Sequence, residues 1–143
     1  MPRLRRKAVA AHGEVAGRTL VGRRTKDLTK RLEPGDIAII DHADLDRVAA
    51  DGLIDAGVAA VVNAASSITG RYPNGGPLRL VRAGVVLLDA AGPEVMDDEL
   101  DGRRLRLRDG QLLDGDVVVA SGHPLLEEEI ERRMEEARAG IGH

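Results

Sequence analysis

Cysteine, phenylalanine and tryptophan are absent from the 143 residues, and Tyr72 is the single aromatic side chain. Without cysteine the chain has no disulfide, no thiolate metal site and no cysteine nucleophile. Without aromatic rings to stack on bases, binding of nucleic acid is not expected. The core must be built from Val, Leu, Ile and Ala, whose small branched side chains suit strands and the helices that cover them.

Long apolar runs are also missing. No run approaches the roughly 20 residues that span a bilayer, and the basic start is not followed by the apolar region of a signal peptide. We therefore expect a soluble, cytoplasmic domain.

Charge is divided unevenly along the chain. Residues 1–31 hold ten Arg or Lys and two acidic residues, a balance of +8, whereas residues 89–143 have a balance of −8. The basic head at residues 2–7 is either a solvated terminus or a contact for nucleic acid, anionic lipid or an acidic partner. Both interpretations stay open, and the nucleic-acid hypothesis predicts binding that weakens steeply with salt.

The apolar pattern predicts an α/β domain in which strands and helices alternate along the chain. Continuous apolar runs predict buried parallel strands, and Asp109-Gly110 predicts a hairpin turn. We expect strands at 14–21, 37–40, 58–62, 84–88, 103–108, 111–113 and 117–120 (the last one buried), a helix capped by Asp44, and further helices at 77–83 and 93–100.

The last part of the chain is expected to be an amphipathic helix. Its apolar residues fall on one helical stripe, which is typical of a core or of a coiled-coil seam. A homo-oligomer formed through residues 124–138 is therefore predicted, and the chain is expected to continue into further domains. The stripe consists of Leu125, Leu126, Ile130, Met134 and Ala137.

Three regions follow from these patterns. Residues 1–22 are the basic amino-terminal segment and first strand, and residues 23–122 are the α/β domain. Residues 123–143 are expected to be an amphipathic connector or oligomerisation helix.

The first candidate site follows the strand at 37–40, at the strand end where open α/β sheets bind ligands. One histidine and three carboxylates lie within six residues, a combination that could hold a hard metal ion or perform acid-base chemistry. The same carboxylates are equally suited to capping the next helix, so both interpretations stay open. The candidate residues are Asp41, His42, Asp44 and Arg47.

The second candidate site is the polar, glycine-rich stretch 66–77, which follows a strand and precedes a helix. Its glycines permit close approach to a ligand, and its hydroxyl, amide and guanidinium groups suit phosphate. The stretch matches neither a P-loop nor a dinucleotide fingerprint. We predict a binding role, with no catalytic residue, no metal ligand and an unknown cofactor. The candidates are Ser66, Ser67, Arg71, Tyr72, Asn74 and Gly76, with Asn63 before the stretch and with Arg24 and Lys26 if their loop converges on it.

Five segments together resemble the amino-terminal region of the actinobacterial SteA family of cytokinetic ring proteins. They are RTK at 24–26, PGDIAIIDH at 34–42, DLDR at 44–47, AVVNA at 60–64 and GRYPNGGP at 70–77. In that family the chain continues into a thiamin pyrophosphokinase-like domain and a hydrophobic carboxyl-terminal segment. The resemblance implies a role in cell division and envelope assembly, a membrane-associated partner of the SteB type, and a place at the inner face of the membrane at the division site.

A second resemblance concerns the fold. The order from residue 61 through the glycine-rich loop to the hairpin resembles the swivelling β/β/α domains of phosphoenolpyruvate-utilising enzymes. Those domains carry a phosphorylated histidine in the loop before the matching helix, where this chain has NGGP at 74–77 and no histidine. The resemblance implies a three-layer β/β/α domain of swivelling type, followed here by the carboxyl-terminal connector helix.

Two functions are therefore expected from different classes. The first is a regulatory and assembly binding module of a SteA-like protein. The alternative is a ligand- or phosphate-binding domain that completes a thiamin pyrophosphokinase-like, nucleotide-dependent enzyme, in which Arg24, Lys26 and Arg71 grip phosphate groups. ATP would then belong to the later domain that the resemblance implies.

Overall fold

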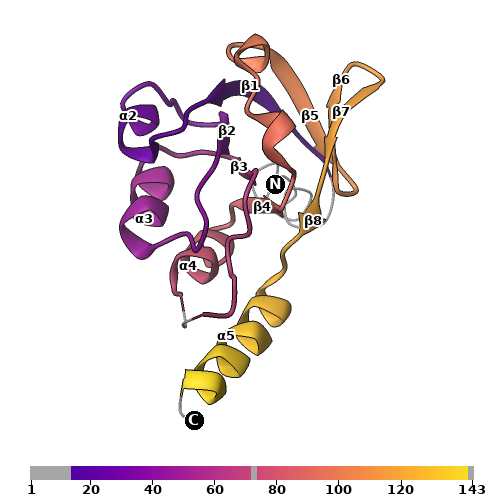
Figure 1. The fold of residues 1–143 in the computed structure, drawn as a ribbon. Helices are drawn as coiled ribbons and strands as arrows, with labels where there is room; N and C mark the ends of the chain where they lie inside the picture. Colours follow the sequence, from indigo (N-terminus) through magenta and orange to yellow (C-terminus); the bar gives the residue numbers. More distant parts are fainter. Residues whose placement is uncertain (1–13, 72–73, 142–143) are drawn as a thin grey trace, which may run out of the picture.

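The computed structural model describes residues 14–71 and 74–141 (Figure 1). The basic head and Tyr72 therefore lie outside the described residues. In chain order the elements are β1 Val15–Val21, α2 Thr25–Thr29, β2 Ile37–Ile40, α3 Arg47–Asp55, β3 Ala60–Asn63, α4 Gly76–Arg82, β4 Val86–Asp89, the 3₁₀ turns η1 Pro93–Val95 and η2 Asp98–Leu100, β5 Arg104–Arg108, β6 Gln111–Asp114, β7 Val117–Ser121, β8 His123–Pro124 and α5 Glu127–Ile141.

The strands of the described residues form one mixed sheet in the order β7-β6-β5-β1-β2-β3-β4-β8. Strands β1 to β4 are parallel neighbours, joined by the helices α2, α3 and α4. Strands β5, β6 and β7 continue the sheet as an antiparallel meander beyond β1, and β8 pairs antiparallel with β4 at the other end.

The two ends of this sheet are joined by a single residue, Gly122. Strand β7 ends at one side of the strand order, and β8 begins at the other side two residues later, so the sheet must curl round. Gly122 donates from its backbone N to the carbonyl of Gly110 at 2.9 Å, and a Cβ at this position would lie 2.5 Å from the carbonyl oxygen of Asp89. Glycine is therefore required where the chain crosses between the two edges.

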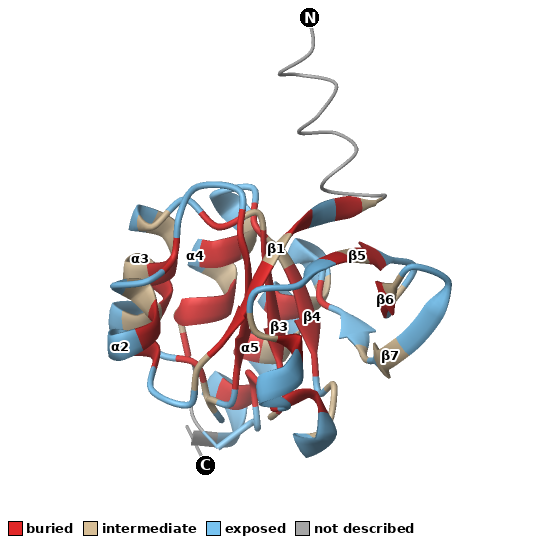
Figure 2. Ribbon diagram, turned by 90° about the horizontal axis from the view of Figure 1, so that it is seen from above, coloured by how far each residue is buried: buried red, intermediate tan, exposed pale blue. Residues whose placement is uncertain are grey.

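Two apolar cores lie on the two faces of the parallel strands. Ala38 and Ile40 face the helices, whereas Ile37 and Ile39 face β5, β6 and the 3₁₀ turns. Figure 2 shows the helices α2, α3 and α4 on one side of the central strands and the β5–β7 meander on the other. The predicted α/β class with three layers and a carboxyl-terminal helix is confirmed.

Three local predictions were wrong. The expected helix at 93–100 is two 3₁₀ turns, because Gly92 has a φ of +92° and Asp97 begins a new turn by accepting a hydrogen bond from Glu99. The cap of α3 is Asp46 rather than Asp44. The strand expected to be buried at 117–120 is exposed at its start, where Val117 is 64% accessible, because β7 is an outer strand of the meander.

Helix α5 packs against the same domain. Leu125, Ile130 and Met134 belong to the helix-side core, and Ala137 is also buried. Strand β8, just before the helix, extends the sheet. The apolar stripe is therefore covered within the chain, apart from the exposed Leu126. The stripe therefore gives no support to the expected coiled-coil seam. The homo-oligomer stays a prediction that this stripe does not support.

None of the helices in the described part of the chain combines the length and the apolar character needed to cross a membrane.

Candidate functional site

The two predicted sites meet at one edge of the sheet. Because β1, β2 and β3 are parallel, the loops that follow them emerge on the same side. We call residues 22–26, 41–47, 64–71 and 74–76 the carboxyl-edge loops. They contain every candidate among the described residues except Asn63, which is the last residue of β3.

Asn63 ties the loops after β2 and β3 together. Its side chain is fully buried, and its Oδ1 accepts hydrogen bonds from the backbone N atoms of His42 and Ala65, both at 3.1 Å. Its Nδ2 donates to the carbonyl of His42 at 2.9 Å and to the Ser67 hydroxyl at 2.7 Å. All four hydrogen-bonding positions of this amide are filled by the protein, so Asn63 holds the two loops together. Its contact with a ligand stays a prediction.

Ser67 and Asn74 extend the same network. The backbone N of Ser67, which is fully buried, donates to Asp89 Oδ1 at 2.9 Å, and its carbonyl accepts from Asn74 Nδ2 at 2.9 Å. Asn74 and Asp89 are also buried, at 5% and 2% exposure. These residues link the glycine-rich loop to the end of β4. These partners show a structural role for Ser67 and Asn74, and their direct contact with a ligand stays a prediction.

Asp44 fastens the first loop to the second from outside. It has a φ of +51°, the left-handed region that Asp tolerates better than most residues. Its carboxylate accepts from the backbone N of Thr69 at 2.8 Å and from the Thr69 hydroxyl at 2.7 Å. The hydroxyl of Ser66 donates to the carbonyl of Ile68. Asp44 and Ser66 are therefore engaged within the loops.

His42 lies between two polar side chains. Its Nδ1 is 3.4 Å from the Thr25 hydroxyl, and its Nε2 is 3.4 Å from Asp46 Oδ2. Asp46 also caps α3 by accepting a hydrogen bond from the backbone N of Ala49 at 2.7 Å. The capping interpretation of the acidic cluster is therefore confirmed for Asp46, whereas Asp41 is exposed on the loop.

Gly76 belongs to the packing of the loops. A Cβ at this residue would overlap the carbonyl oxygens of Leu45 and Asp46, which are backbone atoms and cannot swing aside. Glycine is thus required where α4 begins against the loop after β2.

The exposed cations of the carboxyl-edge loops differ from the other cations of the domain. Ten of the seventeen Arg and Lys residues in the described ranges form an ion pair with a carboxylate. The other seven have no carboxylate within 4.0 Å among the described residues, and five of them lie on the carboxyl-edge loops or at the start of α3. These five are Arg23, Arg24, Lys26, Arg47 and Arg71.

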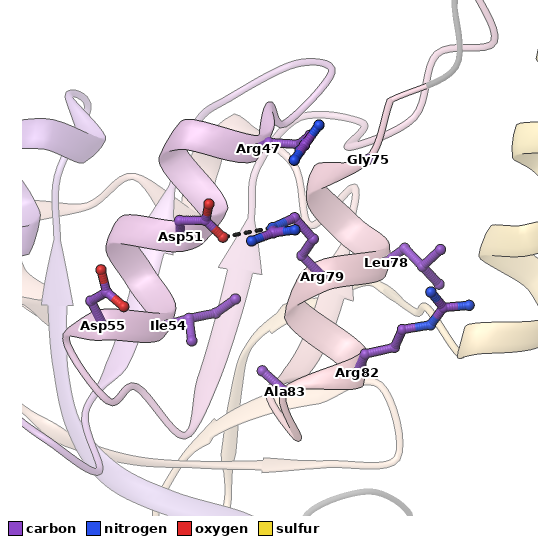
Figure 3. Close-up of a pocket in the computed structure, with 9 residues that line it drawn as sticks. All are labelled: Arg47, Asp51, Ile54, Asp55, Gly75, Leu78, Arg79, Arg82 and Ala83. Atoms are coloured by element: carbon purple, nitrogen blue, oxygen red, sulfur yellow. Dashed lines mark hydrogen bonds and ion pairs between the residues drawn. The ribbon is translucent and has the colours of Figure 1, made fainter.

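A groove lies next to these loops, between α3 and α4 (Figure 3). It has a volume of about 740 Å³ and shares Arg47 and Gly75 with the carboxyl edge. Across the groove, Arg79 Nε donates a hydrogen bond to Asp51 Oδ1 at 2.6 Å. The full lining is Arg47, Asp51, Ile54, Asp55, Gly75, Leu78, Arg79, Arg82 and Ala83.

Arg82 at the end of this groove is held by α5. It donates to Glu127 at 3.0 Å and to Glu131 at 3.3 Å. The hydrogen bond to Glu127 raises the pKa of the Arg82 guanidinium and lowers the pKa of the Glu127 carboxyl. An acidic helix of the chain itself is thus recognised by an arginine of α4.

The described residues contain no group of three or more His, Asp or Glu side chains placed to hold a metal ion. The buried polar groups of Asn63, Ser67 and Asn74 instead form a scaffold that also includes the carboxylate of Asp89, and exposed cations lie on the same loops. Such an arrangement can bind a negatively charged group by charge-assisted hydrogen bonds.

A comparison with protein-family models finds no match for this chain, and a comparison with curated proteins finds none either.

The structure brings most of the predicted site residues together but divides their roles. Residues that were missed include Thr25 and Asp89, which complete the loop contacts. Thr69, one of the hydroxyl donors expected in the stretch 66–77, donates to Asp44. The arginines of the groove, Arg79 and Arg82, were also missed. The sequence shows that these two arginines lie three residues apart. It does not show that α3 faces Arg79 and that α5 faces Arg82.

Proposed function

We propose that this domain is a binding module that recognises an anionic group at the carboxyl edge of its parallel sheet. The observation that carries the proposal is a set of cations on the carboxyl-edge loops that form no ion pair with any described residue: Arg23, Arg24, Lys26, Arg47 and Arg71. An anion approaching this edge meets guanidinium and ammonium groups that need not first release an internal partner.

The scaffold under these cations supports the same proposal. The loops after β2 and β3 are fastened by Asn63 and Ser67 inside and by Asp44 outside. Loops held in this way lose little conformational entropy when a ligand binds, which strengthens binding. Binding is therefore the function that this edge supports best.

In the cell, we propose that the domain serves as a regulatory and assembly module of a SteA-like protein in cell division and envelope assembly. This proposal comes from the sequence motifs, several of which form the carboxyl-edge loops. The partner would be a membrane-associated division protein of the SteB type, and the anionic group would be supplied by that partner.

The alternative is a phosphate-binding domain that completes a thiamin pyrophosphokinase-like enzyme. The specific observation in its favour is that Arg24, Lys26 and Arg71 have no ion pairs among the described residues. Cations on loops at this end of an α/β sheet suit the phosphate groups of a nucleotide.

Binding of an anion is tested with inorganic pyrophosphate in a thermal-shift titration followed by calorimetry. A ligand at about 100 times its dissociation constant stabilises the folded state by about 2.7 kcal/mol. The double variant Arg24→Gln/Lys26→Gln should lose this stabilisation. Its matched control is Arg104→Gln/Lys30→Gln, which also removes one arginine and one lysine without ion pairs, but away from the carboxyl edge.

The control should bind pyrophosphate as the parent protein does. If the parent protein does not bind, or if both double variants bind equally well, the cations of the carboxyl edge are not a specific anion site. A parallel titration with ATP separates the two candidate functions. Tighter binding of ATP than of pyrophosphate favours the enzyme domain, and equal or weaker binding favours the assembly module.

A further inference from the structure

The groove between α3 and α4 carries an inference about a partner. We propose that it is a docking site for an acidic, amphipathic helical segment of another protein. This surface lies beside the carboxyl edge but differs from it in chemistry, so the proposal does not depend on anion binding at the edge.

The shape of the groove fits an extended ligand. It runs between two neighbouring helices, and its wall combines apolar and charged groups (Figure 3). Ile54 and Leu78 are half-buried there and rest on the helix-side core. A helix laid in such a groove buries an apolar stripe while its polar face stays in water.

The charges of the groove favour an acidic ligand by a small margin. Three arginines and two aspartates, Asp51 and Asp55, line it, which gives a balance of +1. Arg82 is held by α5, and Arg47 has no ion pair within the described ranges. Arg79 is paired with Asp51, but both side chains are exposed, at 44% and 43%. Exposed pairs of this kind contribute little to stability, so a carboxylate of a partner can replace Asp51 at small cost.

Helix α5 shows which chemistry α4 accepts. It lies beside α4 and presents Glu127 and Glu131, four residues apart, to Arg82. It buries Ile130 between them against the same core. A partner helix with carboxylates at i and i+4 and an apolar residue between them would repeat this contact at Arg79 and Arg47, on the other flank of α4.

The probe for the test is a synthetic 14-residue helical peptide with Leu and Glu at the spacing just described. Nitrogen-labelled protein is titrated with the peptide, and backbone amide shifts are followed by NMR. We expect the largest shifts in α3 and α4. A peptide of the same composition in scrambled order should bind at least about tenfold more weakly, because its apolar and acidic residues no longer share a face.

The variant Arg79→Glu should weaken binding of the ordered peptide by about tenfold or more. Its matched control is Arg108→Glu, which also reverses an exposed, ion-paired arginine, but on β5. The control should bind the peptide normally. An amide spectrum of each variant shows that it is folded, and the milder Arg79→Gln should give an intermediate affinity.

Three results would overturn the proposal: no binding, equal binding of the scrambled peptide, or shifts centred on the carboxyl-edge loops. The last result would mean that the peptide binds only as an anion. Because Arg47 belongs to both sites, variants tell the two sites apart: Arg24→Gln/Lys26→Gln should lose pyrophosphate and keep the ordered peptide, and Arg79→Glu should do the reverse. If the parent protein binds the ordered peptide but not pyrophosphate, the proposed function is contradicted and the groove proposal stands.

Discussion

The charged side chains at the two edges of the parallel sheet differ in whether they form ion pairs. At the amino edge, Arg18 donates to both carboxylate oxygens of Asp36, at 3.1 and 2.6 Å, and Asp36 also accepts from the backbone N of Glu33 at 2.8 Å. At the carboxyl edge, the buried residues Asn63, Ser67 and Asp89 are joined by hydrogen bonds without an ion pair, and the exposed cations of the loops have no ion pairs within the described residues either.

The difference separates charges that hold the fold from charges that are available to a ligand. Asp36 is almost fully buried, and burial alone would raise the pKa of its carboxyl. The hydrogen bonds from Arg18 and Glu33 outweigh burial and hold that pKa below its ordinary value. A carboxylate used in this way is committed to the fold, whereas a loop cation without an internal partner is not.

The largest effect is expected from breaking the buried scaffold of the carboxyl edge. Asn63→Ala leaves the backbone N atoms of His42 and Ala65 and the carbonyl of His42 without their partner. Each unsatisfied buried group costs about 1–3 kcal/mol, so we expect a loss of about 4 kcal/mol in the free energy of unfolding, measured by urea denaturation.

Ser66→Ala is the matched control for this change. It removes a half-buried hydroxyl that donates to the carbonyl of Ile68 within the same loop, and it should cost about 1 kcal/mol or less. A cost below 1 kcal/mol for Asn63→Ala would show that the scaffold does not hold the loops together.

The second effect concerns the amino edge and its dependence on pH. Because the folded-state pKa of Asp36 is lowered, its contribution to stability is fully present above the unfolded-state pKa of about 3.9. It is lost as the pH falls through the folded-state pKa. Asp36→Asn should therefore be less stable than the parent protein at pH 7, and the two stabilities should converge in acid.

Urea denaturation at a series of pH values measures this convergence. Asp101 behaves in the same direction, since its hydrogen bonds from the backbone N of Val21 and from Arg31 outweigh burial and lower its pKa. Some acid sensitivity will therefore remain in Asp36→Asn. The fully exposed Asp116 supplies the control, because Asp116→Asn should follow the parent curve. A constant stability gap at every pH would contradict the assigned role of Asp36.

Much of this architecture was predictable from apolar patterning. Strands such as Ile37–Ile40 and the α/β class follow from continuous apolar runs and their order. The three layers were expected from the resemblance to the swivelling domains. The exposure of β7 was not predicted, because the apolar run alone does not show that this strand is the outer strand of the meander. The cap of α3 was misplaced by two residues, since the contact of Asp44 with Thr69 joins loops 25 residues apart.

The candidate site was predictable in place but not in detail. Polar residues after adjacent parallel strands were expected to converge, and they do. Asn63, Ser67 and Asn74 were expected to bind a ligand. In the structure they form hydrogen bonds with one another, and Asn63 also bonds to the backbone of His42 and Ser67 to Asp89, partners that the residue types cannot reveal. The lack of ion pairs at the loop cations was also not predictable, because the sequence does not show which arginines lie beside carboxylates in the described part of the fold.

The third effect concerns the hydrogen bonding of a buried hydroxyl in the core, between the two edges of the sheet. Thr19 on β1 is fully buried, and its hydroxyl has no hydrogen-bond partner in the described structure. Thr19→Val removes this group at nearly the same volume and should stabilise the protein by about 1 kcal/mol. Denaturation in urea measures the gain, and Thr29→Val, whose hydroxyl donates to the carbonyl of Lys26, should show none.

The smallest effect on stability is expected from the cations of the carboxyl edge. Arg24 and Lys26 are exposed and have no ion pair among the described residues, so Arg24→Gln/Lys26→Gln should change the free energy of unfolding by no more than about 0.5 kcal/mol. The matched comparison is Arg18→Gln at the amino edge, which removes the partner of a buried carboxylate and should destabilise the protein clearly more. If the carboxyl-edge variant were as unstable as Arg18→Gln, its cations would belong to the fold, and a loss of pyrophosphate binding in that variant could no longer be assigned to direct contact with the anion.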